Sequence, residues 1–333
     1  METGYVQRVT WIDAMRGVCM FMVILYHSGA PVEYDKFLIP FFLSGFFFLS
    51  GYLFYTPGSR WDWKHKLIRV VETLLIPYLL YWTLTYFVKA FYYDVYLHDN
   101  WDILLPYFCE LLSGSKLWFI SALIVGEIVL TGILSVSQNV WFLGGLIVVV
   151  SLVWWFTPLS VPGVFWPWYL PSACIGLCFM LLGAIVRQKG WLDYLERRWV
   201  AVSVVVFYLL LYVMDLAFNI IRISFASNYF ENLLLFYVYA LCGLSFLYVV
   251  CKNCLGKSRF LCYIGRNTLL MYFFCNQVIL LIARVTENGW GMSAYVWSVV
   301  AACLACLLLV VPVEVTKRWL PWMAGKGRIS LKE

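Results

Sequence analysis

The sequence has few charged residues and few histidines. Asp, Glu, Lys and Arg together make up 13% of its 333 residues, there are three histidines, and hydrophobic residues make up 63%, with a mean hydropathy of +0.83. A soluble domain of this length cannot bury so much apolar surface in its interior, so the composition excludes an ordinary soluble protein. It predicts an all-α polytopic membrane protein, because helices satisfy their own backbone hydrogen bonds in lipid.

Several kinds of segment are also missing from the chain. No small-residue cleavage site follows a short apolar core near its beginning, so we expect no removable signal peptide. The sequence shows no internal repeat and no linker long enough to separate two domains. We therefore expect residues 1–333 to form a single transmembrane domain, with no soluble domain attached.

The eleven cysteines are not arranged for disulfides or metals. Cys109 is the only cysteine in an expected outer loop, which excludes a disulfide between two outer loops. The Cys-x-x-Cys spacings at Cys251/Cys254 and Cys303/Cys306 have no nearby cluster of His or Cys to complete four ligands. We interpret the cysteines as small apolar filler and expect no metal.

Apolar runs of roughly 20 residues, separated by charged residues or by Pro and Gly, predict ten transmembrane helices. The helices are expected at residues 9–29, 38–56, 67–90, 117–136, 140–157, 170–187, 199–221, 231–250, 261–283 and 293–316.

The Lys and Arg residues indicate how these helices are oriented. Most of the 24 basic residues fall on the side of the membrane where the amino terminus lies, and Arg16 falls within the first helix. Those expected on the other side are Lys36, Lys89, Lys116, Arg222 and Arg284. The positive-inside rule then predicts that both termini are cytoplasmic. The net charge of +6 follows from this topology, so we expect contacts with membrane lipids and none with nucleic acid.

The first expected helix, IDAMRGVCMFMVILYH from Ile12 to His27, carries charged and polar residues. Arg16 and His27 share one face, because eleven residues turn the helix about three times, and they lie about 16 Å apart. A charge at membrane depth costs about 2.5 kcal/mol or more, so it usually faces a bundle interior or a cavity. A purely structural alternative is that Asp13 and Arg16 form an ion pair that anchors the helix, while water hydrates His27. All three residues on one stripe favour a functional channel or cleft.

Five sequence motifs occur in an order that resembles a known family. They are Arg16 and His27 with ten residues between them, FFFLSGYLF (46–54), KHKLIRVVETLLIPY (64–78), KLWFISALIVGE (116–127) and IGRNTLLMYFF (264–274). Together they resemble the membrane-bound acyltransferase-3 superfamily, particularly the sugar O-acetyltransferases related to fucose 4-O-acetylase. In that family the last motif commonly continues into a histidine, whereas Cys275, Asn276 and Gln277 follow here.

The resemblance implies an O-acetyltransferase of the bacterial inner membrane. Such an enzyme would move acetyl from cytoplasmic acetyl-CoA, its cosubstrate, to a hydroxyl of a cell-surface or lipid-linked glycan, and it could form a homo-oligomer. The donor is anionic, so its phosphates would favour basic residues at the inner mouth. The candidates are Arg16, Arg60, Lys64, Lys66, Arg69 and Arg266, of which Arg266 could instead cap its helix and reach the interface.

Sugar hydroxyls are weak acids, so their acylation needs a base, and histidine can supply one near neutral pH. His27 could deprotonate the acceptor, or it could accept the acetyl group and pass it on. Glu127 and Asp215 are the carboxylates best placed to orient the imidazole, while Asp215 could instead make a buried structural hydrogen bond. Glu72, Glu231 and Asn232 are less favoured.

We expect the remaining substrate contacts to come from Asp13, Ser50, Trp118 and Asn276. Ser50 could equally serve close helix packing. The aromatic segments 91–114 and 163–171 would suit either stacking on sugar rings or anchoring at the interface. A small-molecule transporter of the same superfamily is the alternative function, because buried charges also line transport pathways. The absence of inverted repeats and the basic inner mouth favour the enzyme.

Overall fold

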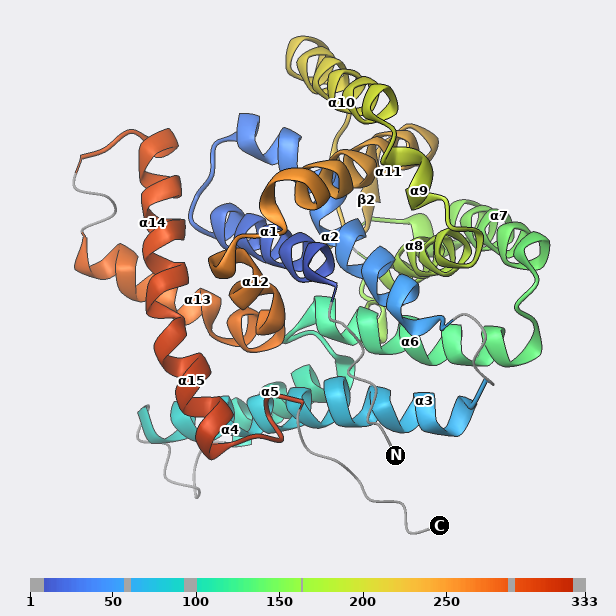
Figure 1. Cartoon of the computed structure of the whole chain (residues 1–333). Coiled ribbons are helices and arrows are strands. Elements are labelled where there is room, and N and C mark those ends of the chain that lie inside the picture. Colours follow the sequence, from blue (N-terminus) through green and yellow to red (C-terminus); the bar gives the residue numbers. More distant parts are fainter. Residues whose placement is uncertain (1–8, 57–60, 93–100, 163, 287–290, 326–333) are drawn as a thin grey trace, which may run out of the picture. The chain divides into compact units, whose positions relative to one another are not determined.

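The computed structural model of the chain describes residues 9–56, 61–92, 101–162, 164–286 and 291–325. The predicted all-α class is confirmed, since helices dominate Figure 1. The strands within these residues are β1 (Ile223–Ser224) and β2 (Tyr229–Phe230), which pair antiparallel with Ile223 opposite Phe230.

The helices follow one another along the chain with short connections. They are α1 (Thr10–His27), α2 (Val32–Phe54), α3 (Trp63–Val70), α4 (Ile76–Tyr92), α5 (Trp101–Ser113), α6 (Trp118–Val136), α7 (Val140–Phe156), α8 (Leu170–Lys189), α9 (Leu192–Leu195), α10 (Arg198–Phe218), α11 (Leu233–Val250), α12 (Arg259–Arg266), α13 (Thr268–Val285), α14 (Ala294–Leu308) and α15 (Val310–Trp319). Short π-helical turns η1 (Val71–Leu75) and η4 (Cys251–Leu255) and the 3-10 turns η2 (Pro158–Ser160) and η3 (Pro167–Tyr169) lie between them.

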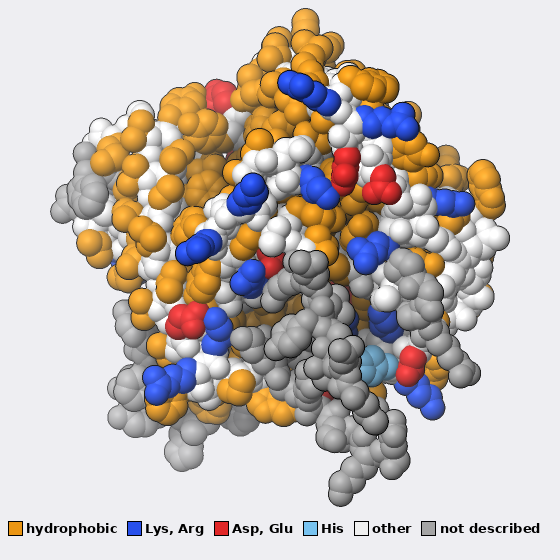
Figure 2. Space-filling model, in the orientation of Figure 1, with side chains coloured by type: hydrophobic (Ala, Val, Ile, Leu, Met, Phe, Trp, Pro, Cys, Tyr) orange, Lys and Arg blue, Asp and Glu red, His pale blue; other side chains and the backbone are white. Residues whose placement is uncertain are grey.

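The predicted polytopic membrane character is confirmed by the lengths and compositions of these helices. Within the described ranges, 8 helical stretches are long and apolar enough to cross a membrane, and α7 is a shorter apolar helix. Together with α1, which carries Asp13 and Arg16, they occupy the positions of the ten predicted spans. Hydrophobic side chains cover much of the surface in Figure 2, as lipid-facing helices require.

Two predicted spans are interrupted, which corrects their expected boundaries. The helix expected over 261–283 is divided into α12 and α13 at Asn267, whose side-chain amide donates to the carbonyl of Tyr263 at 2.8 Å. This bond satisfies a carbonyl of the last turn of α12 and ends that helix. The helix expected over 293–316 is divided at Leu309, because Pro312 has no N–H to continue the backbone ladder.

The chain forms two compact units, of which the first contains residues 1–49, 191–221 and 232–313. Helix α1 is at the centre of this unit and packs against α12, α13 and α14 (Figure 1). Its backbone approaches α12 closely, since a Cβ at Gly17 would overlap the carbonyl of Leu261 and one at Gly265 would overlap that of Asp13. The small residues therefore allow α1 to be held tightly inside the unit.

The second unit contains residues 50–190, 222–231 and 314–333. In it α8 packs against both α6 and α7. A Cβ at Gly51 would overlap the backbone of Met180 in α8, and Gly126 of α6 faces the same methionine side chain. The last turns of α2 therefore lie against α8, so the small residues of the FFFLSGYLF motif serve close packing here.

Candidate active site

His27 is the last residue of α1, where the helix ends in a well-defined turn. Ser28 caps the end through its backbone N–H and through a hydroxyl bond to the carbonyl of Ile24 at 2.8 Å, and Gly29 turns the chain with φ at +78°. The imidazole is exposed and lies edge-on to the Tyr26 ring, with 5.5 Å between ring centres. Among the described residues it has no hydrogen-bond partner, so both ring nitrogens can face a substrate.

Asp13 lies at the other end of α1 and is held in an ion pair within the first unit. Its Oδ2 accepts a bond from Nε of Arg266 in α12 at 2.9 Å. The carboxylate is 4% exposed, whereas the Arg266 side chain is about half exposed. Arg16 is half-buried one turn further along α1. Two residues proposed for different roles, Asp13 for substrate and Arg266 for donor phosphate, are therefore joined directly.

Asp215 lies near the end of α10 and is 2% exposed. Its Oδ1 accepts the backbone N–H of Ile221 at 2.8 Å, while its carbonyl accepts Nζ of Lys36 at 2.7 Å. In the part of the chain that the structure describes, it makes no hydrogen bond or ion pair with His27. These bonds are typical of a residue that closes the turn after a helix, which was the structural alternative for Asp215.

Glu127 of α6 is half-buried in the second unit and accepts a hydrogen bond from the hydroxyl of Ser50. The Glu127 carboxylate also attracts the ammonium group of Lys66 in α3 electrostatically. The Lys66 ammonium donates to the carbonyl of Phe54 at 2.6 Å and lies 5.0 Å from the centre of that ring. Ser50, Glu127 and Lys66, which we selected from three separate motifs, are thus neighbours in space.

Further basic residues lie in the same unit. Lys64 and Arg69 are exposed on α3, and Arg60 lies outside the described residues. The analysis of the sequence missed Arg187, whose guanidinium lies 4.6 Å from the centre of the Tyr52 ring. The sequence could have indicated Arg187 by its place in the last turn of α8, because a cation is expected at the cytoplasmic end of a span.

Trp118 begins α6 and is half-buried, with its ring 5.7 Å from that of Tyr169. Tyr169 and Trp168 both adopt left-handed backbone conformations, with φ at 50° and 56°. Such a conformation costs about 1 kcal/mol or more for each non-glycine residue, and two in succession mark a place where surrounding contacts impose the backbone. Asn276 is exposed on α13 in the first unit.

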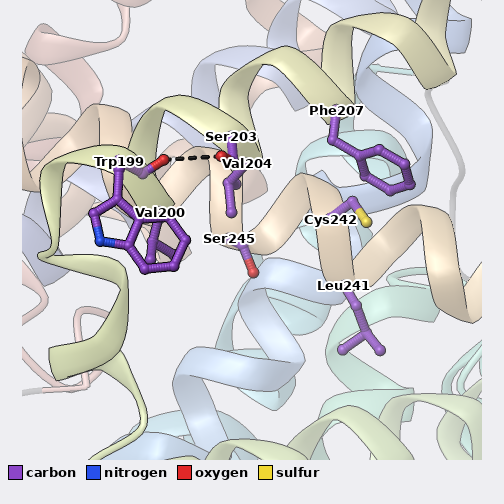
Figure 3. A pocket seen from close by; sticks show the side chains of 8 residues that line it. All are labelled: Trp199, Val200, Ser203, Val204, Phe207, Leu241, Cys242 and Ser245. Atoms are coloured by element: carbon purple, nitrogen blue, oxygen red, sulfur yellow. Dashed lines mark hydrogen bonds between the residues drawn. The ribbon is translucent and has the colours of Figure 1, made fainter.

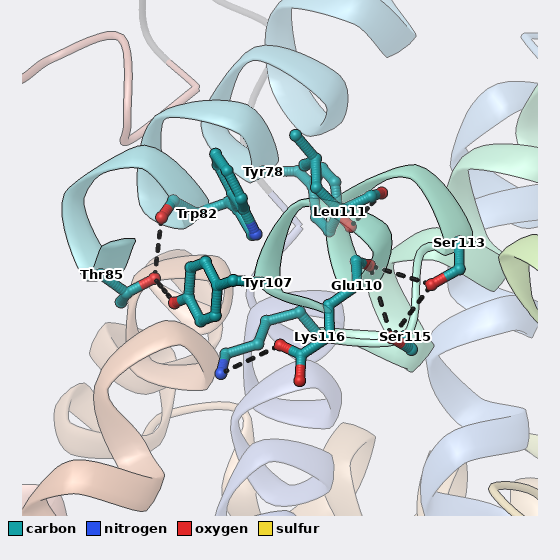
Figure 4. A network of polar contacts seen from close by, with 9 residues as sticks. All are labelled: Tyr78, Trp82, Thr85, Tyr107, Glu110, Leu111, Ser113, Ser115 and Lys116. Atoms are coloured by element: carbon teal, nitrogen blue, oxygen red, sulfur yellow. Dashed lines mark hydrogen bonds and ion pairs between the residues drawn. The ribbon is translucent and has the colours of Figure 1, made fainter. Parts of the chain in front are cut away.

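A network of aromatic and polar side chains joins α4 and α5 (Figure 4). The Tyr107 hydroxyl donates to Thr85 at 2.9 Å, and Lys116 lies 5.0 Å from the centre of the Tyr107 ring and 3.7 Å from Glu110. The Trp82 ring lies beside Tyr107, and among the described residues its indole N–H is buried without a partner. With the predicted orientation, this network is on the outer side of the second unit.

Within the described residues, no group of three or more His, Cys, Asp or Glu side chains gathers in an arrangement that could hold a metal ion.

Comparison with known proteins identifies the family of the chain. A family model described as an acyltransferase domain, that of the acyltransferase-3 family, matches residues 9–315. Comparisons with curated proteins and with solved structures gave no match. The match covers nearly the whole chain and includes both ends of α1, so it confirms the predicted superfamily. The narrower relation to sugar O-acetyltransferases stays a prediction. The chain belongs to the acyltransferase-3 family and is a membrane acyltransferase.

Proposed function

We propose that the protein is a bacterial inner-membrane O-acetyltransferase that transfers acetyl from cytoplasmic acetyl-CoA to a hydroxyl of a cell-surface or lipid-linked glycan. The observation that carries this proposal is the exposed His27 at the end of α1, with no hydrogen-bond partner among the described residues. A general base must reach the proton that it removes, and the exposed imidazole of His27 leaves its ring nitrogens accessible to an acceptor hydroxyl.

The cationic residues of the second unit support an anionic donor. Lys64, Lys66, Arg69 and Arg187 all lie near the ends of spans that are predicted to be cytoplasmic. Guanidinium groups bind phosphate oxygens through two parallel N–H bonds, and ammonium groups add a point charge. The phosphates of coenzyme A fit this chemistry, whereas a small neutral solute does not use it.

Two routes are open for the transfer itself. In the direct route, Nε2 or Nδ1 of His27 removes the hydroxyl proton while the acceptor oxygen attacks the thioester carbonyl carbon. The tetrahedral intermediate then expels the coenzyme A thiolate, which takes the proton from the imidazolium. In the two-step route, one imidazole nitrogen attacks the thioester carbonyl carbon and expels the coenzyme A thiolate, which takes the proton from the other ring nitrogen. The acceptor hydroxyl then attacks the acetyl-imidazole, and its proton passes to the imidazole as that ring leaves. Both routes need the same open imidazole.

The acceptor is proposed on chemical grounds. Aromatic rings stack on the apolar faces of sugars, and charged side chains hydrogen-bond to sugar hydroxyls. The network that includes Trp82, Tyr107, Glu110 and Lys116 offers both at the side predicted to be outer. A glycan acceptor delivered from that side would suit these residues, although they also anchor α4 to α5.

The test uses acetyl-CoA labelled in its acetyl group and the purified full-length protein in detergent. Wild type is compared with His27→Ala, and label is followed on protein, in water and on added glycan. Loss of label from the donor should require His27, and label trapped on the protein would favour the two-step route. His65→Ala is the matched control, because it removes an exposed histidine of α3.

Two outcomes would contradict the proposal. One is near-normal transfer by folded His27→Ala protein, which would remove His27 from the chemistry. The other is a folded wild-type protein that neither binds nor turns over the donor. Solute uptake by the same protein in liposomes would then favour the transporter alternative.

A further inference from the structure

A groove of about 350 Å³ lies between α10 and α11, within the first unit. It is lined on α10 by Trp199, Ser203, Val204 and Phe207, and on α11 by Cys242 and Ser245. The small side chains Ser203, Cys242 and Ser245 leave the space open, while Trp199 and Phe207 lie at its two ends in Figure 3. The hydroxyl of Ser203 bonds to the carbonyl of Trp199 at 2.9 Å, and the Ser245 hydroxyl is the other side-chain oxygen in a lining that is mostly apolar.

The length of the groove matches one leaflet of a bilayer. The eight steps from Trp199 to Phe207 rise about 12 Å along α10 at roughly 1.5 Å per residue. Half of the hydrocarbon core of a bilayer is about 15 Å thick. Since α10 is one of the apolar spans, the groove extends from one membrane interface to near the midplane. A single acyl chain would fill it along its length.

The interfacial end of the groove is positively charged. Arg197 is the N-cap residue of α10 and Arg198 its first residue, directly before Trp199, and both are exposed. The Arg197 guanidinium lies 5.5 Å from the centre of the Tyr194 ring. In the described part of the chain, neither arginine has a carboxylate partner.

The carboxylate that directly precedes them in the sequence, Glu196, is already engaged by α11 and η4. It accepts the hydroxyl of Tyr248 at 3.1 Å and the ammonium of Lys252 at 2.8 Å. Its charge is therefore balanced by Lys252, so Arg197 and Arg198 leave two cations at the end of the groove for an anionic group.

We propose that the groove and these two arginines bind one anionic phospholipid. An acyl chain lies between α10 and α11, and the phosphate accepts bonds from Arg197 and Arg198. Trp199, which is 69% exposed, lies at the depth where an indole ring prefers the interface. With the orientation predicted from the basic residues, the lipid belongs to the cytoplasmic leaflet. The proposal does not depend on the acyl donor or acceptor.

The test is native mass spectrometry of delipidated, detergent-purified protein. Phosphatidylglycerol is added to one sample and phosphatidylcholine with the same acyl chains to another. We expect one phosphatidylglycerol to be retained with roughly tenfold or higher preference, because each basic residue at the surface favours anionic lipid. The double variant Arg197→Gln/Arg198→Gln should lose this preference, whereas Arg222→Gln, an exposed arginine of the second unit, should keep it.

A second variant tests the groove itself. Val204→Trp should fill it and remove the bound lipid, whereas Val213→Trp changes an exposed valine of the same helix outside the groove and should have no effect. Equal retention of both lipids by wild type, or retention of phosphatidylglycerol by the double arginine variant, would overturn the proposal. The proposal would also be overturned if wild type formed a dimer that Val204→Trp did not form, because the occupant of the groove would then be a second copy of the chain.

Discussion

Arg266 of α12 donates a hydrogen bond to the carboxylate of Asp13 in α1, with 2.9 Å between Nε and Oδ2, across 253 residues of sequence. The bond connects the helix that carries His27 to the short helix on which it packs. Gly17 and Gly265 allow the backbones of α1 and α12 to approach closely beside this ion pair. The position of α1, and with it that of the candidate base, therefore depends on this contact.

Replacing Arg266 by glutamine should destabilise the protein by about 1–3 kcal/mol. The change removes the Arg266 guanidinium from a buried carboxylate, and breaking a fully buried ion pair costs about 3–5 kcal/mol. The cost is smaller here because the Arg266 side chain is half exposed and screened by solvent. Thermal unfolding in detergent measures the effect. Arg259→Gln, an exposed arginine of the same helix, is the control, and an equal shift in both variants would contradict the prediction.

A double-mutant cycle separates the pair from other contacts of Asp13. Asp13→Asn removes the charge that Arg266 compensates, so the combined variant Asp13→Asn/Arg266→Gln should be more stable than the sum of the single effects predicts. Additive effects would show that Arg266 and Asp13 do not interact in solution.

Neutralising the basic residues of α3 should weaken donor binding more than turnover. If Lys64 and Arg69 contact phosphates of acetyl-CoA, Lys64→Gln and Arg69→Gln should each raise the donor KM roughly tenfold with little change in kcat, because these contacts hold donor and transition state equally. The increase should shrink at high salt, which screens exposed charges. Arg222→Gln serves as the control, and an unchanged donor KM in the α3 variants would remove them from the donor site.

Glu196 should make stability depend on pH in the acidic range. The hydrogen bond from Lys252 lowers the pKa of Glu196 below its ordinary value of 4.5, with the Tyr248 hydroxyl adding to the effect. The stabilisation is present above that ordinary value and is lost as the pH falls through the lower pKa of the folded state. Since Glu196 is largely exposed, its contribution should stay under about 1 kcal/mol.

The measurement compares the thermal midpoints of wild type and Glu196→Gln between pH 7 and pH 3. The difference between them should be greatest at pH 7 and should narrow toward pH 3. A constant difference over this range would show that the Glu196 charge does not contribute through Lys252.

The order of the helices could be predicted from the sequence, because apolar runs and basic flanks depend on the membrane and not on tertiary contacts. Their exact ends depend on single hydrogen bonds that hydropathy does not detect. Asp62 caps the start of α3 by accepting the backbone N–H of His65, and Asn232 caps α11 in the same way through Leu235. Asn267 ends α12 between Arg266 and Thr268, inside the span expected over 261–283.

The candidate site was predictable only where its residues share one helix. The common face of Arg16 and His27 follows from helical periodicity, whereas the pairing of Asp13 with Arg266 depends on which helices pack together. The same holds for Ser50 with Glu127 and for Arg187 over Tyr52. Each of these contacts joins separate helices, and the sequence spacing between them carries no information on their distance.

Asp215 should prove to be a structural residue of the α10 end. Asp215→Ala removes the acceptor for the N–H of the half-buried Ile221, and leaving that donor unsatisfied should cost about 1 kcal/mol of stability. Asp215→Asn keeps an acceptor oxygen at the same position, so its stability should stay close to that of wild type. Because the hydrogen bonds of Asp215 are to Ile221, Lys36 and Asn219, acyl transfer per folded molecule should be near normal in both variants. If Asp215→Asn were stable but lost transfer activity and shifted its pH–rate profile, the carboxylate would instead be orienting the catalytic imidazole, since an amide cannot stabilise an imidazolium as a carboxylate does.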